Sequence, residues 1–344
     1  MPLPYLTADV PGAGGLFKAV PEDFEVDELP AYEPSAEVGS DEHLFLWVEK
    51  RGRSTPDVAK LIARHVGAQE RDVTWAGLKD RQGITRQYLS LPSKFEAKLP
   101  GFAAEGVTIL RTARHRNKLK SGHLRGNRFT VVVRDVSDLG AARATLARLL
   151  SLGIPNFFGD QRFGRDGENA AKGKAILLGG GRHRDRFERK LFLSAFQSAL
   201  FNDVLAQRIR AGTFAQALAG DVLKKHETNG EFICAEPTVD QPRVEAFEVS
   251  PTGPIFGPSM RPASGEPGER EAEVLAAEGV TTQTFEAGGR ETDGTRRFFR
   301  VPLVGLEVEA LAEQALRLRF ELPAGAYATV LLRELLKSGE APAV

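Results

Sequence analysis

The chain has 344 residues, 42% of them apolar and 27% charged, which is the composition of a globular protein with about two domains. No apolar run reaches the roughly 20 residues of a membrane-spanning helix, and the first residues lack the basic and apolar regions of a secretory signal. A single cysteine, Cys234, excludes an internal disulfide and fits a reducing compartment, so we expect a cytoplasmic protein. The six histidines are scattered, and we expect no metal site.

The first predicted elements are two strands, at residues 43–49 and 87–91, with a helix between them. Thr55 is predicted to be the N-cap of this helix and Pro56 to occupy its first position. Gly67 stands where the helix should stop. Apolar residues recur at helical spacing along one face, namely Val58, Leu61, Ile62 and Val66. This pattern predicts a helix that packs on a sheet.

The rest of the chain alternates between strand and helix patterns. Periodicity predicts further strands at residues 107–111, 128–136 and 316–322, and helices at residues 139–152 and 328–336. Helical patterns also dominate residues 167–209. The Gly- and Pro-rich tract at residues 250–269 is predicted to hold little regular structure.

These elements predict an α+β protein in which one domain interrupts another. Strand-rich sequence at the two ends predicts a discontinuous domain of residues 1–153 and 306–344. The helix-rich middle predicts an inserted domain of residues 154–305.

The net charge is zero, with 46 cationic and 46 anionic residues, but the charges are segregated along the chain. Residues 111–128 hold seven Lys or Arg residues, two histidines and no acid, and residues 181–190 form a second cationic patch. A local basic stripe attracts phosphates even on a neutral molecule. Charge alone does not distinguish two interpretations of this stripe, a nucleic-acid interface and a solvated charged loop.

Five stretches place an aromatic or amide side chain near glycine or proline. They are PEDFEV (21–26), WAGLKDRQGITRQYLS (75–90), RGNRFT (125–130), GIPNFFGDQRFG (153–164) and LPAGAYAT (322–329). Loop aromatics near cationic segments suit stacking on unpaired bases. Any one of these rings could equally anchor a loop, and Asp80 read alone is a surface turn residue. Together the five stretches favour a nucleotide pocket.

The same stretches resemble the tRNA pseudouridine synthase D (TruD) family. Residues 77–87 are similar to its signature, G-x-K-D-basic-x-small-x-T-x-Q, and PNFFGDQRFG is similar to its second hallmark. PEDF and GNRFT match two more motifs, and the resemblance runs over nearly the whole chain in the same order. It implies a pseudouridine synthase fold, with a large mixed, mainly antiparallel sheet flanked by helices. It also implies that the insertion is a helix-rich α/β TRUD domain.

By this resemblance, the protein isomerises a uridine of tRNA, usually at position thirteen, to pseudouridine. It implies no cofactor, no metal and no obligate protein partner, and a monomer. Asp80 would be the catalytic carboxylate, and the stripe would contact tRNA phosphates through Arg114, Arg116, Lys118 and Lys120. The residues that would bind the substrate are Phe24, Lys79, Asn127, Phe129 and Tyr327. The family commonly has phenylalanine at the position of Tyr327.

The chemistry fits an aspartate. The reaction breaks a carbon–nitrogen glycosidic bond and rejoins the base through carbon, so nothing is oxidised. An ionised carboxylate can attack C6 of uracil or C1′ of ribose, and the sequence leaves both routes open. Burial disfavours an ionised carboxylate, whereas an adjacent cation favours it. Lys79, Arg81 or an arginine distant in sequence could be that cation.

Two other functions share some of these features. An RNA-binding protein without chemistry would use the basic stripe and the aromatics but would not need Asp80. A hydrolase of nucleosides or glycosides would need a second carboxylate as general acid, and residues 75–90 contain none beside Asp80.

Overall fold

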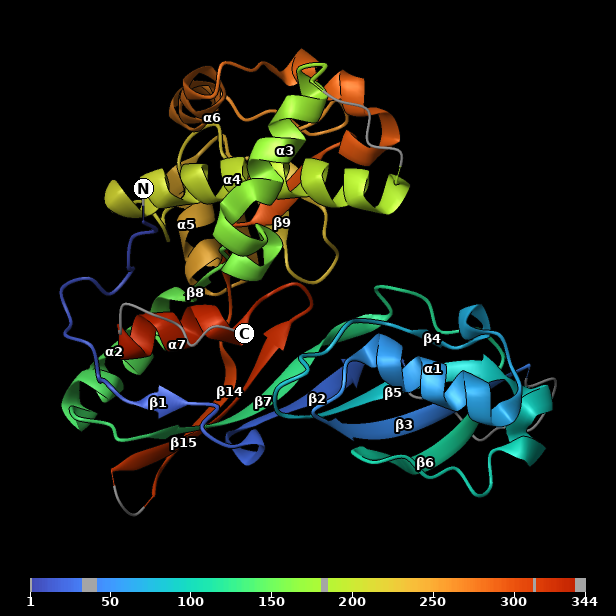
Figure 1. Ribbon diagram of the computed structural model, residues 1–344. Coiled ribbons are helices and arrows are strands. Elements are labelled where there is room, and N and C mark those ends of the chain that lie inside the picture. The colour runs from blue at the N-terminus through green and yellow to red at the C-terminus, as the bar shows by residue number, and fades with distance from the viewer. Residues whose placement is uncertain (1, 33–41, 181–184, 312–313, 338–344) are drawn as a thin grey trace. The chain divides into compact units, whose positions relative to one another are not determined.

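The computed structural model describes residues 2–32, 42–180, 185–311 and 314–337 (Figure 1). These residues form two compact units. The sheet unit comprises residues 13–139 and 303–325, and the helical unit comprises residues 2–12, 140–302 and 326–337. The predicted α+β class is confirmed. The insertion of residues 154–305 stays a prediction about domain organisation.

The sheet unit is built on one large sheet. Its strands, in the part of the chain that the structure describes, are β1 (Leu16–Phe17), β2 (Phe24–Pro30), β3 (His43–Arg51), β4 (Thr74–Trp75), β5 (Ile84–Pro92), β6 (Val107–His115), β7 (Leu124–Arg134), β14 (Val304–Leu311) and β15 (Ala315–Pro323). The order is β14-β15-β7-β2-β5-β3-β6, with β1 beside β7 and β4 beside β5. All neighbours are antiparallel except β2 and β5, which run parallel.

The helix α1 (Thr55–Val66) packs on this sheet through the predicted apolar face. Leu44, Leu46 and Val48 alternate along β3 and pack with Val58 and Ile62 of the helix. The N-cap is Ser54 rather than Thr55, and Ser54 Oγ accepts from the main-chain N–H of Asp57 at 3.3 Å. The prediction is wrong by one residue because Thr55 is fully buried and its hydroxyl has partners in the interior.

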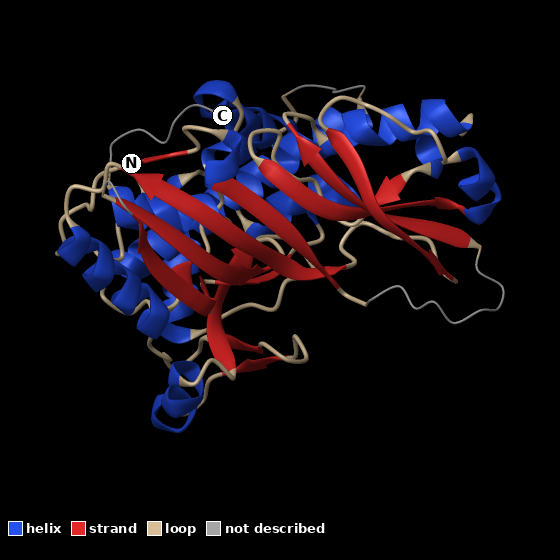
Figure 2. Cartoon of the chain, turned by 90° about the horizontal axis from the view of Figure 1, so that it is seen from below, coloured by secondary structure: helices blue, strands red, loops and turns tan. Residues whose placement is uncertain are grey.

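Figure 2 shows the strands of the large sheet running side by side, coloured red. Each strand predicted for this sheet lies within an observed strand or overlaps one. Much of the basic segment 111–128 therefore belongs to β6 and β7, and residues 116–123 connect them.

The helical unit contains the longest helix that the structure describes, α4. Its helices are α2 (Leu139–Leu152, in this unit from Gly140), α3 (Glu168–Leu177), α4 (Arg186–Arg210), α5 (Pro237–Glu245), α6 (Gly265–Ala277) and α7 (Ala328–Leu336). Its strands are β8 (Ile154–Pro155), β9 (Val222–Lys225), β10 (Glu231–Ile233), β11 (Val249–Ile255), β12 (Thr295–Phe298) and β13 (Arg300–Val301). The ranges predicted for α2 and α7 are confirmed.

The prediction for residues 250–269 is wrong. Strand β11 covers the beginning of this tract and α6 its end. Pro251 and Pro254 lie within β11, opposite Leu223 and Arg296. Proline cannot donate to a strand ladder, but its carbonyl still accepts, and Pro251 O accepts from Phe299 N at 3.0 Å. The helices of the described residues are all too short or too polar to cross a bilayer.

Glycine is required where the segment before β5 passes β2. Gly83 has φ +113°, and an added Cβ would lie 2.4 Å from the carbonyl oxygen of Phe24. Gly52 also has a positive φ, +65°, but an added Cβ there meets nothing within 4 Å. We expect Gly83→Ala to lower the free energy of unfolding by about 3 kcal/mol or more, because the main chain must move. Gly52→Ala should cost only about 1 kcal/mol.

Urea denaturation of the two variants measures this difference. Equal losses of stability would show that the close approach of Gly83 to Phe24 is not needed for the fold.

Candidate active site

Asp80 lies in the segment that connects β4 to β5, directly before the parallel pair β2–β5 begins. Parallel strands start at the same edge of a sheet. Because Glu25 lies opposite Ile84, the first residue of β2, Phe24, comes close to the segment that carries Asp80. The sheet topology thus brings two motifs together that are more than fifty residues apart in the sequence.

The cation beside Asp80 is Lys18. Its Nζ lies 3.5 Å from Asp80 Oδ2, and the Lys18 side chain is 5% exposed while that of Asp80 is 33% exposed. The same ammonium lies 4.2 Å from the ring centroid of Phe24. Lys18 has φ +61°, an uncommon conformation for lysine, between β1 and the 3-10 turn Pro21–Asp23. The Asp80 carboxylate is therefore paired through Oδ2 with a buried ammonium, while part of the side chain stays exposed.

The sequence did not identify Lys18. The sequence offered Lys79, Arg81 or a distant arginine, whereas the partner is a distant lysine. Lys79 pairs with Glu28, and Arg81 Nε donates to Gly52 O at 3.2 Å. No local pattern of the sequence reveals Lys18, because the pairing of β1 with β7 places the segment that carries it.

Lys79 points into the interior of the sheet unit. Its Nζ lies 2.7 Å from Glu28 Oε2, and both side chains are almost fully buried. Burial raises the pKa of Glu28, and the Lys79 ammonium opposes that shift. Removing one partner of such a pair would leave a buried charge uncompensated. The geometry gives Lys79 an ion pair beneath the segment, whereas the sequence analysis assigned it to substrate binding.

Two more buried side chains hold the segment before Asp80. Thr55 Oγ1 accepts from Lys79 N at 3.1 Å and donates to Gln87 Oε1 at 2.7 Å. Gln87 Nε2 donates to Gly77 O at 2.9 Å. Lys79 and Gln87 are positions of the signature in residues 77–87, and in this structure both hold the main chain that presents Asp80.

Three strands supply an aromatic cluster next to this segment. Phe24 of β2 is 1% exposed, and its ring centroid is 6.1 Å from that of Phe129 on β7. Phe129 in turn stacks on Phe320 of β15 at 5.3 Å. Contacts therefore run continuously from Asp80 through Lys18 and Phe24 to Phe129.

Asn127 has an unsatisfied buried atom. It lies on β7, opposite Glu28 of β2 and Leu322 of β15, and its Oδ1 is buried without a hydrogen-bond partner. A buried carbonyl oxygen without a donor is costly and uncommon in native structures. The side chain is a candidate for binding a polar ligand group.

Tyr327 belongs to the helical unit, where it is the residue before α7 and is 38% exposed. The whole second hallmark, PNFFGDQRFG, is in the same unit. There Phe158 is anchored by Asn202, whose side chain accepts from Phe158 N at 2.9 Å and donates to its carbonyl at 3.0 Å. The guanidinium of Arg297 lies 4.1 Å from the Phe158 ring centroid.

The four predicted phosphate contacts lie together at the end of β6 and in the connection that follows. Arg114, Arg116 and Lys120 are exposed and Lys118 is half-buried. Arg114 is already paired with Glu96 at 2.7 Å, and Lys118 Nζ donates to Arg71 O at 3.5 Å.

The second cationic patch, residues 181–190, has fewer free charges for binding phosphates in its described part than the stripe at residues 111–128. Residues 181–184 lie outside the described residues. Arg186 and Arg189, within the described part of the patch, pair with Glu291.

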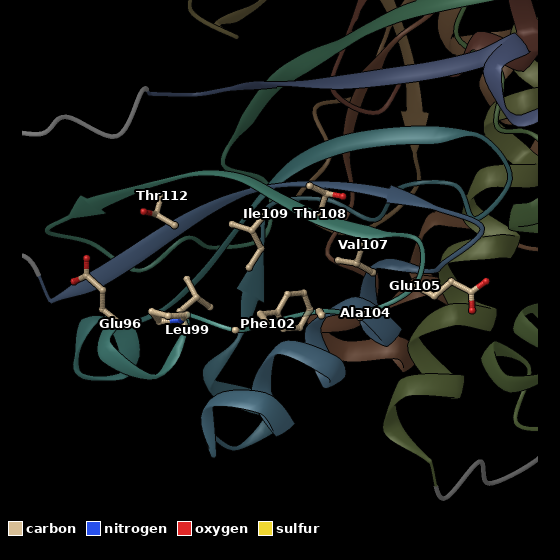
Figure 3. Close-up of a pocket in the computed structure, with 12 residues that line it drawn as sticks. Glu96, Leu99, Phe102, Ala104, Glu105, Val107, Thr108, Ile109 and Thr112 are labelled. Atoms are coloured by element: carbon tan, nitrogen blue, oxygen red, sulfur yellow. The ribbon is translucent and has the colours of Figure 1, made fainter.

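A hollow of about 880 Å³ lies elsewhere on the sheet unit, between the 3-10 helix Ser93–Lys98 and β6 (Figure 3). Figure 3 shows Glu96 and Glu105 at opposite ends of it. Leu99, Phe102 and Ile109 line it and pack against the core below α1. None of the predicted site residues lines this hollow. No group of three His, Cys, Asp or Glu side chains in the described residues could hold a metal ion.

Comparison with known proteins agrees with this architecture. The family model described as tRNA pseudouridine synthase D (TruD) matches residues 2–182 and 185–335. A tRNA pseudouridine synthase D from Anaeromyxobacter dehalogenans strain 2CP-C is 52% identical over 342 residues, which are 98% of this chain and 97% of that protein. A protein of the same name from Thermus thermophilus is 41% identical over 336 residues, 97% of this chain and 92% of that protein.

A crystal structure from Methanosarcina mazei, described as a putative tRNA pseudouridine synthase D, superposes with a TM-score of 0.76. It is 24% identical and covers 97% of this chain and 96% of its own. This likeness confirms the predicted fold. The identities and the family match together show that the chain belongs to the tRNA pseudouridine synthase D (TruD) family.

Proposed function

We propose that the protein binds tRNA, extrudes the uridine at position thirteen and converts it to pseudouridine with Asp80 as the catalytic carboxylate. As a member of the TruD family it is a tRNA pseudouridine synthase, an isomerase that acts on tRNA. The position in the tRNA and the role of Asp80 are the parts that we propose. The observation that carries the role of Asp80 is its pair with Lys18 at the edge of the aromatic cluster, whereas position thirteen rests on the family resemblance alone.

The reaction asks for an ionised carboxylate at the ribose–uracil junction. The bond between C1′ and N1 breaks, a bond between C1′ and C5 forms, and the proton of C5 leaves while N1 gains one. Asp80 can form a transient bond to C6 of the base or to C1′ of the sugar. The nucleotide would approach the exposed part of the Asp80 side chain, since the Lys18 side chain is buried.

Lys18 serves to hold the Asp80 carboxylate in place when RNA covers the site. A third of the Asp80 side chain is exposed in the free protein, so water screens the pair. Bound RNA would exclude that water, and the attraction between the two charges would then grow as the local dielectric falls. The ammonium also lies over Phe24, which fixes its position relative to the ring.

The extruded uracil would be held by an amide and by rings. The buried Oδ1 of Asn127 can accept from the N3–H of uracil, and the amide N–H group can donate to a uracil carbonyl. Extrusion costs a few kcal/mol, and stacking on an aromatic ring offsets about 1–3 kcal/mol per base. Phe24 and Phe129 form the buried aromatic wall in the sheet unit, and substrate binding by the partly exposed Tyr327 of the helical unit stays a prediction from the family resemblance.

The first test replaces Asp80 with asparagine, which keeps the shape and removes the charge. We expect pseudouridine formation in unmodified tRNA, without added cofactor, to fall at least about 1,000-fold. The Kd for tRNA should stay within several-fold of the wild-type value. Asp166→Asn makes the same change at an exposed position of the helical unit and should leave both quantities unchanged.

Chemical mapping of pseudouridine and a filter-binding assay measure the two quantities. Loss of tRNA binding together with activity would instead indicate a structural role for Asp80. Release of free uracil by the wild-type enzyme would indicate a hydrolase, and unchanged tRNA would indicate a binding protein.

The second test removes the cation. Lys18→Met keeps most of the side-chain length, but it removes the ammonium over Phe24 and leaves the Asp80 carboxylate without its ion-pair partner. A charged hydrogen bond contributes about 1.5–3 kcal/mol, so we expect the single-turnover rate constant to fall about 10- to 100-fold. The control is Lys60→Met on α1, whose ammonium is 3.9 Å from Glu70 at an exposed position. An unchanged rate in Lys18→Met would remove Lys18 from the mechanism.

The third test concerns the basic stripe. Replacing Arg114, Arg116, Lys118 and Lys120 with glutamine should weaken tRNA binding. It should also reduce the slope of log K against log salt by up to about 3, at ~0.7–0.9 for each phosphate that is no longer neutralised. Arg114 should contribute least, because Glu96 already neutralises it. The control replaces Arg317 and Arg319, which pair with Glu309 and Glu307. An unchanged salt slope in the stripe variant would exclude the stripe from the tRNA footprint.

A further inference from the structure

Lys50 is a buried charged residue that the mechanism above does not use. It is the penultimate residue of β3 and is 3% exposed. Its Nζ donates to three main-chain carbonyl oxygens: Arg53 O at 2.8 Å, Lys79 O at 3.3 Å and Asp80 O at 2.6 Å. An ammonium group has three N–H donors and no acceptor, so these three carbonyls use all of its hydrogen-bonding capacity.

Two of the three acceptors belong to the segment that carries Asp80, and the shortest of the three bonds is to the carbonyl of Asp80 itself. Lys50 in turn is held on both sides by the sheet, opposite Thr85 of β5 and Val107 of β6. A paired strand is among the least mobile parts of a protein, whereas a connecting segment is among the most mobile. The ammonium therefore ties the peptide of Asp80 to the rigid sheet.

The other two side chains under this segment bind the main chain of residues that precede Asp80. Thr55 binds the N–H of Lys79, and Gln87 binds the carbonyl of Gly77. Lys50 differs from both because its ammonium binds the main chain of Asp80 itself. Loss of this bond would free the Asp80 peptide to rotate and move the carboxylate relative to Lys18.

We propose that Lys50 is a positioning residue of the reaction, which holds the Asp80 peptide so that the carboxylate faces Lys18 and the incoming nucleotide. The inference rests on the proposed role of Asp80. It adds a residue outside the motifs of the sequence analysis, at the end of a strand that the family signature does not include.

The arrangement makes the position of Asp80 sensitive to pH. Burial lowers the pKa of Lys50 to about 8; the Asp80 carboxylate opposes this shift and the Lys79 ammonium adds to it. Those two neighbours are themselves paired, with Lys18 and Glu28 respectively. The neutral amine has two N–H donors and a lone pair, so one of the three carbonyls would face the lone pair. The hold on the segment weakens as the pH rises through about 8.

Weakening of the hydrogen bonds from Lys50 to the Asp80 segment is distinct from unfolding of the protein. In the unfolded chain a lysine has its ordinary pKa of 10.5, so between pH 8 and 10.5 the unfolded state binds more protons at this group than the folded state does. The contribution of Lys50 to the free energy of unfolding therefore increases with pH in that window. A fall in activity there cannot come from Lys50 destabilising the fold.

The experiment compares Lys50→Met, which keeps the apolar stem and removes all three donors, with the Lys60→Met control. With enzyme in excess over tRNA at pH 7, we expect the single-turnover rate constant of Lys50→Met to fall at least about 10-fold. Its Kd for tRNA should stay within about twofold, because the side chain is buried and lies outside the binding surface. From pH 7 to 9.5, the rates of wild type and control should fall as Lys50 loses its proton. The rate of Lys50→Met should not show this fall, because the variant lacks that group.

A second readout does not depend on activity. The main-chain N–H of Lys79 donates to Thr55 Oγ1, so its hydrogen exchange reports opening of the segment. At pH 7 we expect exchange at Lys79 to be at least about 10-fold faster in Lys50→Met than in wild type and control. Should Lys50→Met fail to fold, Lys50→Gln, which keeps two N–H donors without the charge, takes its place.

A rate within twofold of wild type at pH 7, or unchanged exchange at Lys79, would overturn the role of Lys50. A wild-type enzyme that makes no pseudouridine would instead count against the proposed function, and the exchange measurement would then decide on Lys50 alone.

Discussion

The site depends on one parallel contact in a sheet that is otherwise antiparallel. Because β2 and β5 run in the same direction, their first residues lie at the same edge. This brings Phe24, the Lys18 ammonium above it and the Asp80 segment together. The close approach of Gly83 to the Phe24 carbonyl shows how little space separates the two strands there. If β2 paired in the antiparallel sense, Phe24 would lie at the opposite end of β5.

Buried charges set the position of Asp80. The Glu28–Lys79 ion pair and the Lys50 ammonium lie beneath the segment, and each had to leave water to do so. Such groups add little to stability, because desolvation offsets most of the attraction. In return they favour one arrangement of the main chain, since any other leaves a buried charge without partners. A connecting segment thereby gains the precision that a catalytic group needs.

The sequence was a good guide wherever periodicity or a motif is local. Helices α2 and α7 were predicted within their bounds, since their apolar residues recur at helical spacing and glycine or loop residues bound them. The tract at 250–269 was misjudged because two prolines fit into β11. Lys18 was missed since its partner is set by strand pairing, and no local pattern reveals that pairing. Lys79 lies in the signature, but only the fold shows that it faces Glu28.

The central claim is that the Asp80 carboxylate faces an extruded uridine. It is tested most directly by a crystal structure of the Asp80→Asn enzyme bound to unmodified tRNA. We predict that the uridine at position thirteen lies outside its stack, with C6 or C1′ within about 3.5 Å of the residue-80 side chain. The hydrogen-bonding edge of its uracil should contact Asn127. A uridine that stays stacked in the RNA, or that lies against a different carboxylate, would contradict the account.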